Sequence, residues 1–182
     1  LRSIQFFDNN KPFASVTNYD AAESFNKYNY EKEFDAVLTN PPFGMADVPR
    51  LFSTFKIKRL EHAMALYALE TMRDNGRAAI IVGGNTRYDE YGRTAGADMI
   101  FLNYLTSHYN VEDVINIDGA SVYTRMGTSF DVRLILINGR KPFEETWTTA
   151  KRDDNLGEED AFSAKQVTNF DTLFIRVNNL IS

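Results

Sequence analysis

The chain has 182 residues, of which 43% are apolar and 25% charged, and it carries a formal net charge of −5 at pH 7. This composition is typical of a globular domain with its own core, and it excludes a disordered, collagen-like or coiled-coil protein. The absence of cysteine excludes disulfides, thiolate metal sites and cysteine nucleophiles. No apolar run is long enough to span a membrane, and we expect a cytoplasmic protein without membrane contact.

The first part of the chain predicts two strands and a rigid corner. Residues 13–19 are rich in Val and Thr, which is typical of a short strand, and residues 34–39 read as a buried strand. Residues 40–44, Asn-Pro-Pro-Phe-Gly, follow directly, and the two prolines exclude a continuing strand or helix. The basic stretch 48–60, which contains no acidic residue, follows this corner, and it is interpreted either as a contact with DNA phosphates or as an ordinary solvated loop and helix start.

The middle of the chain alternates between helix and strand. Apolar residues at helical spacing predict a helix over 60–74, ended by Gly76, and a second helix spans about 95–109. Continuous apolar runs predict strands at 78–82, 111–118 and 130–138. This alternation indicates an α/β fold with right-handed crossovers. The last two strands have no helix between them, so we expect them to pair antiparallel.

The segment 40–43 is the feature that points to chemistry. It stands at the carboxyl end of a predicted buried strand, the edge of an open α/β sheet where ligands bind. Two consecutive prolines fix the backbone, so the Asn40 side chain and the Pro41 carbonyl present two acceptor oxygens with one geometry. A planar amine with two N–H donors can dock on this pair, with the Phe43 ring beside it. The alternative is a Pro-Pro turn without chemistry.

Asn40-Pro41-Pro42-Phe43 resembles the catalytic motif of the S-adenosylmethionine-dependent amino-methyltransferases, in which Asn, Asp or Ser precedes Pro-Pro and then Tyr or Phe. Two hydrogen bonds accepted from an amino group favour a tetrahedral nitrogen, whose localised lone pair can attack the sulfonium methyl. Positioning then provides the catalysis without His or Cys. Residues 115–138 are similar to the strand–loop–strand of adenine-N6 DNA methyltransferases, particularly the modification subunits of type I restriction-modification systems.

The resemblance covers about residues 13–140 and implies a Rossmann-like methyltransferase fold that is partial at its N-terminal side. Its sheet would be mostly parallel with an antiparallel final strand, and it would have a gap or an altered arrangement before the strand at 34–39. No glycine precedes Gly44, so the Gly-rich motif that cradles the cofactor is missing, and we expect a fragment of a longer protein that is inactive alone.

The expected catalytic part spans residues 1–140, and residues 141–182 are expected to form an acidic linker and C-terminal extension. By resemblance, Asp20 would accept a hydrogen bond from the cofactor's adenine amino group, although Asp is also a common turn residue. Phe43 and Tyr123 would clamp the flipped adenine, and the alternative for Tyr123 is a surface aromatic.

Three basic side chains after the Pro-Pro corner are candidates for contact with DNA phosphates: Lys56, Lys58 and Arg59. The alternative is an ordinary solvated loop. No metal site is expected, because the two histidines, His62 and His108, lack ligand spacing.

The resemblance therefore implies a DNA adenine-N6 methyltransferase that uses S-adenosylmethionine, with DNA as its partner and specificity or restriction subunits as further partners. Two other interpretations stay open. The same motif serves other planar amines, such as an RNA base or a protein glutamine amide. A non-catalytic interaction module that keeps the fold is the third interpretation, which the missing Gly-rich loop favours.

Overall fold

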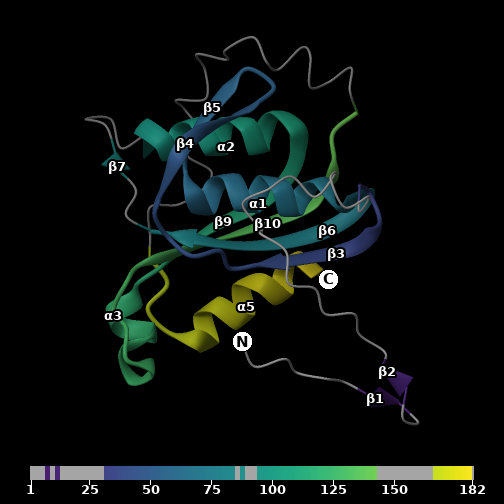
Figure 1. Cartoon of the computed structure of the whole chain (residues 1–182). Helices are drawn as coiled ribbons and strands as arrows, with labels where there is room; N and C mark the ends of the chain where they lie inside the picture. The colour runs from purple at the N-terminus through teal and green to yellow at the C-terminus, as the bar shows by residue number, and fades with distance from the viewer. Residues whose placement is uncertain are drawn as a thin grey trace.

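The computed structural model of the chain describes residues 7–8, 11–12, 31–84, 87–88, 94–142 and 166–181. Its centre is a four-stranded sheet with the strand order β3-β6-β10-β9 (Figure 1). The strands are β3 (Phe34–Thr39), β6 (Met72–Gly83), β9 (Tyr109–Ile117) and β10 (Val132–Arg140). β3 is parallel to β6, and β10 runs antiparallel to both β6 and β9. The chain directions of β3, β6 and β9 therefore agree, and their C-terminal ends meet at one edge.

Helices cover both faces of this sheet (Figure 1). One face carries α1 (Leu60–Glu70), α2 (Gly96–His108) and a hairpin of β4 (Met45–Phe52) and β5 (Phe55–Arg59). The other face carries α5 (Phe170–Ile181). The remaining described elements are β1 (Phe7–Asp8), β2 (Lys11–Pro12), β7 (Arg87–Tyr88), β8 (Thr94–Ala95), α3 (Gly119–Val122) and a 3-10 turn (Thr124–Met126). None of the described helices is long and apolar enough to cross a membrane.

Each face has its own apolar cluster. The larger cluster lies under α1 and α2, and the smaller one lies on the α5 face. The larger includes Val37, Leu66, Leu69, Ile80, Phe101, Leu105, Ile135 and Ile137, and the smaller includes Ile115, Ile117, Val122, Val132 and Val167. Because successive strand residues point to opposite faces, the apolar runs of β6, β9 and β10 supply both clusters.

Most of the predicted elements are confirmed, and the final strand is antiparallel as expected. The predicted mostly parallel sheet is not confirmed, because only the β3–β6 pair is parallel among the three hydrogen-bonded pairs. The physical reason is the position of β10, which inserts between β6 and β9 and so forms two antiparallel pairs. The strand predicted at 13–19, and with it the expected sheet gap, lies outside the described residues.

Two local predictions were wrong. The helix predicted over 60–74 ends at Glu70, and Gly76 lies inside β6 rather than at a helix end. Thr71 closes the helix because its backbone N–H and its hydroxyl both donate to the Ala68 carbonyl. Gly76 instead allows a close approach, since a Cβ there would stand 2.6 Å from Cγ of Met72.

The basic stretch 48–60, for which an ordinary loop and helix start was one interpretation, forms most of the β4–β5 hairpin, and α1 begins at Leu60. The reason is a period of two in β5, where Ile57 is buried while Lys56 and Lys58 are exposed. The hairpin packs on α2 through aromatic contacts, including one of 5.9 Å between the ring centroids of Phe52 and Tyr104.

The described C-terminal segment packs on the same sheet. Val167 forms a parallel bridge with Ile117, and its backbone N–H donates to the Asn116 carbonyl at 2.7 Å. Arg176 of α5 donates two hydrogen bonds of 2.6 Å to the carboxylate of Asp113 on β9. These contacts hold α5 against the sheet, and the division of the chain near residue 140 stays a prediction.

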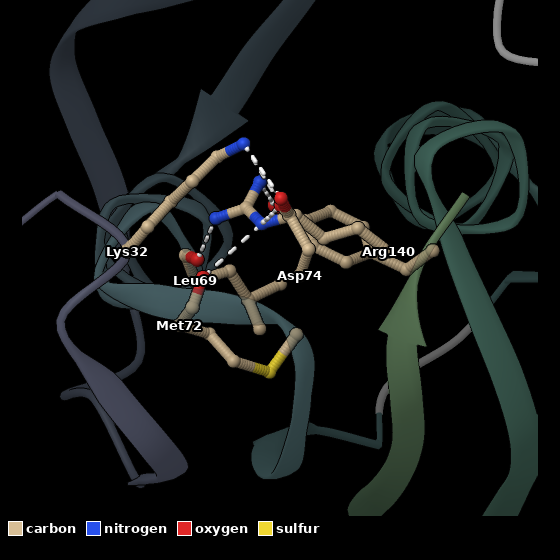
Figure 2. Close-up of polar contacts among 6 residues, drawn as sticks. Lys32, Leu69, Met72, Asp74 and Arg140 are labelled. Atoms are coloured by element: carbon tan, nitrogen blue, oxygen red, sulfur yellow. Dashed lines mark hydrogen bonds and ion pairs between the residues drawn. The ribbon is translucent and has the colours of Figure 1, made fainter. Parts of the chain in front are cut away.

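Arg140, at the end of β10, organises the edge of the sheet opposite the C-terminal ends of β3 and β6 (Figure 2). Its guanidinium donates to the carbonyls of Leu69 and Met72 and lies 3.7 Å from Asp74, which pairs with Lys32 at 2.8 Å. A cation on the last carbonyls of a helix satisfies acceptors and interacts favourably with the helix dipole. Arg140 therefore fixes the end of α1 to the start of β6.

We expect Arg140→Met to lower the free energy of unfolding by about 2 kcal/mol, because the carbonyls and the Tyr109 hydroxyl, 3.0 Å from Arg140, lose a charged donor. Urea unfolding followed by circular dichroism measures the change. The control is Arg77→Met on β6, whose side chain is largely exposed and should change stability by less than about 0.5 kcal/mol. Equal destabilisation of the two variants would contradict this role of Arg140.

Candidate functional site

The register of the sheet brings three loops to one edge. Gly83 pairs with Val132 and Val132 pairs with Ile117, so β6 and β9 end at the same level. Thr39 pairs with Ile80, so β3 ends slightly earlier in the same direction. The residues that follow these strands therefore open at the same side of the molecule. This edge, called here the C-terminal edge, holds the segment 40–44, Gly84 after β6 and the loop 118–131.

The segment after β3 presents the groups that the sequence predicted. Pro41 is buried, whereas Asn40, Pro42 and Phe43 are exposed. Among the residues that the structure describes, none forms a hydrogen bond with the Asn40 side chain or with the Pro41 carbonyl. Both acceptor oxygens are therefore unengaged by that part of the chain.

The Phe43 ring lies over the end of β6. A Cβ built on Gly83 would stand 3.8 Å from Cγ of Phe43 and 3.3 Å from Nη2 of Arg59. A Cβ at this position would press on the end of the Arg59 side chain and stand in ordinary van der Waals contact with the Phe43 ring. Phe43 keeps 44% of its surface exposed, so one part of the ring is open at the C-terminal edge.

A buried carboxylate stands directly behind this segment. Glu61, in the first turn of α1, is completely buried, and its Oε2 accepts a hydrogen bond of 2.9 Å from the backbone N–H of Gly44. Its Oε1 accepts a hydrogen bond of 2.6 Å from Nε of Arg59. Sequence reasoning missed Glu61, because an acidic residue in a first helical turn is common and its burial is a tertiary property.

The first turn of α2 adds a second acid to this cluster. Asp98 lies 4.0 Å from Nη1 of Arg59 and 3.3 Å from Nε2 of His62. His62 is buried and stacks on Phe101 with ring centroids 4.1 Å apart, and its ring nitrogens form no hydrogen bond with the described residues. Both helices begin at the C-terminal edge, where the positive ends of their dipoles favour buried acids.

Asp131 ties the other loops of the edge together. Its backbone carbonyl accepts from the Gly84 N–H at 2.8 Å, and its two carboxylate oxygens accept from the Gly119 N–H at 2.9 Å and from Gln166 at 3.1 Å. One residue therefore connects the ends of β6 and β9 with the C-terminal segment. This role was also missed from the sequence, because it depends on chain segments that meet only in the fold.

The loop after β9 begins with a helix cap. Asp118 accepts hydrogen bonds from the Ser121 hydroxyl at 2.7 Å and from the Ala120 N–H at 3.0 Å. These hydrogen bonds, with the Ser121 hydroxyl the largest cause, lower the pKa of the Asp118 carboxyl. The cap fixes the short helix α3 that leads to Tyr123.

Tyr123 stands at the same edge but on the α5 side of the sheet. It is half-buried, and its ring centroid lies 6.2 Å from that of Phe170 in an edge-to-face arrangement. Among the described residues, no contact joins Tyr123 to Phe43. The structure therefore brings both predicted aromatics to the C-terminal edge without placing them against each other.

A family model described as N-6 DNA methylase matches residues 8–142, about three quarters of the chain. The chain belongs to the N-6 DNA methylase family. The predicted resemblance to adenine-N6 DNA methyltransferases is thus confirmed, and the protein is a DNA methyltransferase that acts on adenine. A search of the curated proteins gives no match. The matched range contains the Pro-Pro corner, both helices of the larger face and all four central strands.

The remaining predicted site residues of the methylase differ in exposure and in their ion pairs. Lys56 and Lys58 are exposed on β5, whereas Arg59 is partly buried and paired with Glu61. Asp20 lies outside the described residues. The predicted roles of all four residues stay predictions.

We expect Gly119→Ala in the methylase to lower the free energy of unfolding by about 1–3 kcal/mol. The new Cβ would overlap the backbone carbonyl of Phe130, and backbone atoms have little room to shift. Gly44→Ala is the matched control, since a Cβ there meets no atom within 4 Å. Urea unfolding of both variants tests the difference, and a stable Gly119→Ala variant would contradict the packing described for this loop.

Proposed function

We propose that this edge of the methylase transfers a methyl group from S-adenosylmethionine to the N6 amino group of an adenine flipped out of DNA. The observation that carries the proposal is a pair of acceptors, the Asn40 amide oxygen and the Pro41 carbonyl, that no described residue engages. Both stand on a proline-fixed backbone at the C-terminal edge, and ligands of open α/β sheets bind at this edge.

In this proposal, Asn40 and Pro41 act mainly by positioning the adenine amino group. The lone pair of an adenine amino nitrogen is delocalised into the ring, so the nitrogen is a poor nucleophile. Hydrogen bonds from its two protons to Asn40 and Pro41 favour a tetrahedral nitrogen with a localised lone pair. The nitrogen forms its new bond to the methyl carbon while the carbon–sulfur bond breaks, and one amino proton is released. When bound, S-adenosylmethionine supplies that methyl group on a positively charged sulfur.

The described residues fit the base-binding half of such a site better than the cofactor half. An exposed aromatic ring and the two acceptors suit a purine with an amino group. For the cofactor, the chain offers Asp20 as the proposed partner of its adenine, and the described residues contain no Gly-rich cradle after a strand. We therefore assign to the described residues the binding and orientation of the target base.

Stacking on aromatic side chains would offset the stacking that a flipped base loses. Phe43 is the first of these side chains, because its ring is exposed beside the two acceptors. We propose Tyr123 as the second. Since Tyr123 packs on Phe170, closing it onto a base would exchange one aromatic contact for another.

Lys56 and Lys58 are the proposed contacts to DNA phosphates. They alternate with the buried Ile57 on β5, so their side chains leave the same face of the hairpin. Phosphate contacts of this kind position a protein on DNA without reading sequence. Arg59 was predicted with them, but its pairing with Glu61 gives it a different setting.

The proposal extends to partners and location as the sequence suggested them. We propose DNA as the substrate, specificity or restriction subunits as further partners, and a cytoplasmic enzyme. The family match favours DNA adenine over an RNA base, a glutamine amide or a non-catalytic module.

We expect Asn40→Ala to reduce methyl transfer roughly 100-fold, because one of two transition-state hydrogen bonds is lost. The assay follows tritium from labelled S-adenosylmethionine into N6-methyladenine, with the full-length protein and DNA that lacks this modification. Asn75→Ala, an exposed asparagine on β6, is the control and should leave the rate unchanged. Full turnover by Asn40→Ala would refute the assigned role.

We expect the double variant Lys56→Gln/Lys58→Gln to bind DNA more weakly and with less dependence on salt. Removing one phosphate-bound cation should reduce the slope of log K against log salt by about 0.9, so the slope should fall by about 1.8 in the double variant. Fluorescence anisotropy of a labelled duplex at several salt concentrations measures both quantities. Lys32→Gln, whose side chain pairs with Asp74 at the opposite edge, serves as the control, and an unchanged slope in the double variant would argue against phosphate binding.

A further inference from the structure

We propose that Glu61, held by Arg59, is a positioning residue that fixes the Asn40–Gly44 segment in the shape needed for methyl transfer. The inference rests on the proposed function of that segment. It concerns a side chain that touches neither base nor cofactor and acts through the backbone of Gly44.

Gly44 is attached to α1 through both of its backbone groups. The Gly44 N–H donates to Oε2 of Glu61 at 2.9 Å, and the Gly44 carbonyl accepts from the backbone N–H of Leu60 at 2.9 Å. Both backbone groups that follow Phe43 are therefore bound by the first turn of α1. Thr39, at the other end of the segment, is held by its pairing with Ile80 in the sheet.

The backbone between Thr39 and Gly44 has little conformational freedom. Only residues 40–43 separate them, and two of these residues are prolines with a restricted φ. The position of Gly44 therefore largely determines where the Pro41 carbonyl and the Asn40 side chain lie. An exposed segment at the edge of a sheet would otherwise have room to shift.

The buried Glu61 carboxylate is paired with the Arg59 guanidinium. Glu61 has no exposed surface, and a buried acid is costly unless it is paired and hydrogen-bonded. Arg59 supplies the pair at 2.6 Å, and Asp98 stands 4.0 Å from the same guanidinium. Replacing a buried ion pair by well-packed apolar residues is often neutral or stabilising, so net stability alone does not account for this pair. We attribute the pair to the positioning of Gly44.

The Arg59–Glu61 pair also lies near the space at Gly83 that the Phe43 ring borders. The space above Gly83 is bordered by Nη2 of Arg59, Oε1 of Glu61 and the Phe43 ring, at 3.3, 3.8 and 3.8 Å from a Cβ built there. The pair thus holds the segment through the N–H of Gly44 and borders the same space as the Phe43 ring. A shift of about 1 Å in a positioned group can cost roughly 100-fold in rate.

Two variants separate positioning from folding. Glu61→Met removes both hydrogen bonds, and we expect kcat to fall roughly 100-fold while KM for DNA changes less than about twofold. Glu61→Gln keeps a carbonyl oxygen that can accept from Gly44, and we expect it to recover part of the lost kcat. Glu70→Gln, at the far end of α1, is the matched control and should retain full kcat.

Hydrogen exchange of the Gly44 amide gives a readout that is independent of activity. We expect its exchange in the 182-residue chain to be about tenfold faster in Glu61→Met than in the unaltered chain, and less accelerated in Glu61→Gln. Urea unfolding of each variant shows whether global stability accounts for the change.

The outcomes distinguish this inference from the proposed function. Unchanged Gly44 exchange, or faster exchange with full kcat, would overturn the positioning role of Glu61. A fall in kcat matched by an equal fall in Glu70→Gln would overturn it as well. Full turnover by Asn40→Ala would instead overturn the proposed function, even if Gly44 exchange still responds to Glu61.

Discussion

The first turn of α1 binds both backbone groups of Gly44, and this contact joins the helix layer to the loop at the end of β3. Without it, the segment 40–43 would be anchored only by the sheet. With it, the two prolines lie between fixed points and present their neighbours in one geometry. In the proposed mechanism, these four residues and one buried carboxylate supply the acceptor pair, and positioning takes the place of a titrating catalytic group.

The two edges of the sheet differ in which backbone groups the charged side chains bind. At the edge of Arg140, one guanidinium donates to the carbonyls of Leu69 in α1 and Met72 in β6 and pairs with Asp74. At the C-terminal edge, Glu61 and Asp131 instead use their oxygens to hold backbone N–H groups of loops. Loops that carry chemistry need such support, because binding groups must keep their geometry on an irregular backbone.

β10 is the strand that makes this edge compact. By lying antiparallel between β6 and β9, it begins where those two strands end. The loop 118–131 therefore stays at the C-terminal edge and does not cross the sheet. Asp131, the last residue before β10, is placed to bond the ends of both neighbours.

Local signals in the sequence were sufficient for β3, for the apolar run within β6, for both helices of the larger face and for the Pro-Pro corner. Each of these depends on residues within one turn or one strand, so spacing and proline stereochemistry predict it. The burial of Glu61 depends on a partner 17 residues away, and the place of Gly76 depends on its contact with β3. The β4–β5 hairpin and the bonds of Asp131 likewise form only when separate segments meet. Tertiary packing alone decided these features, because the desolvation and pairing that favour them do not exist in any isolated stretch of the chain.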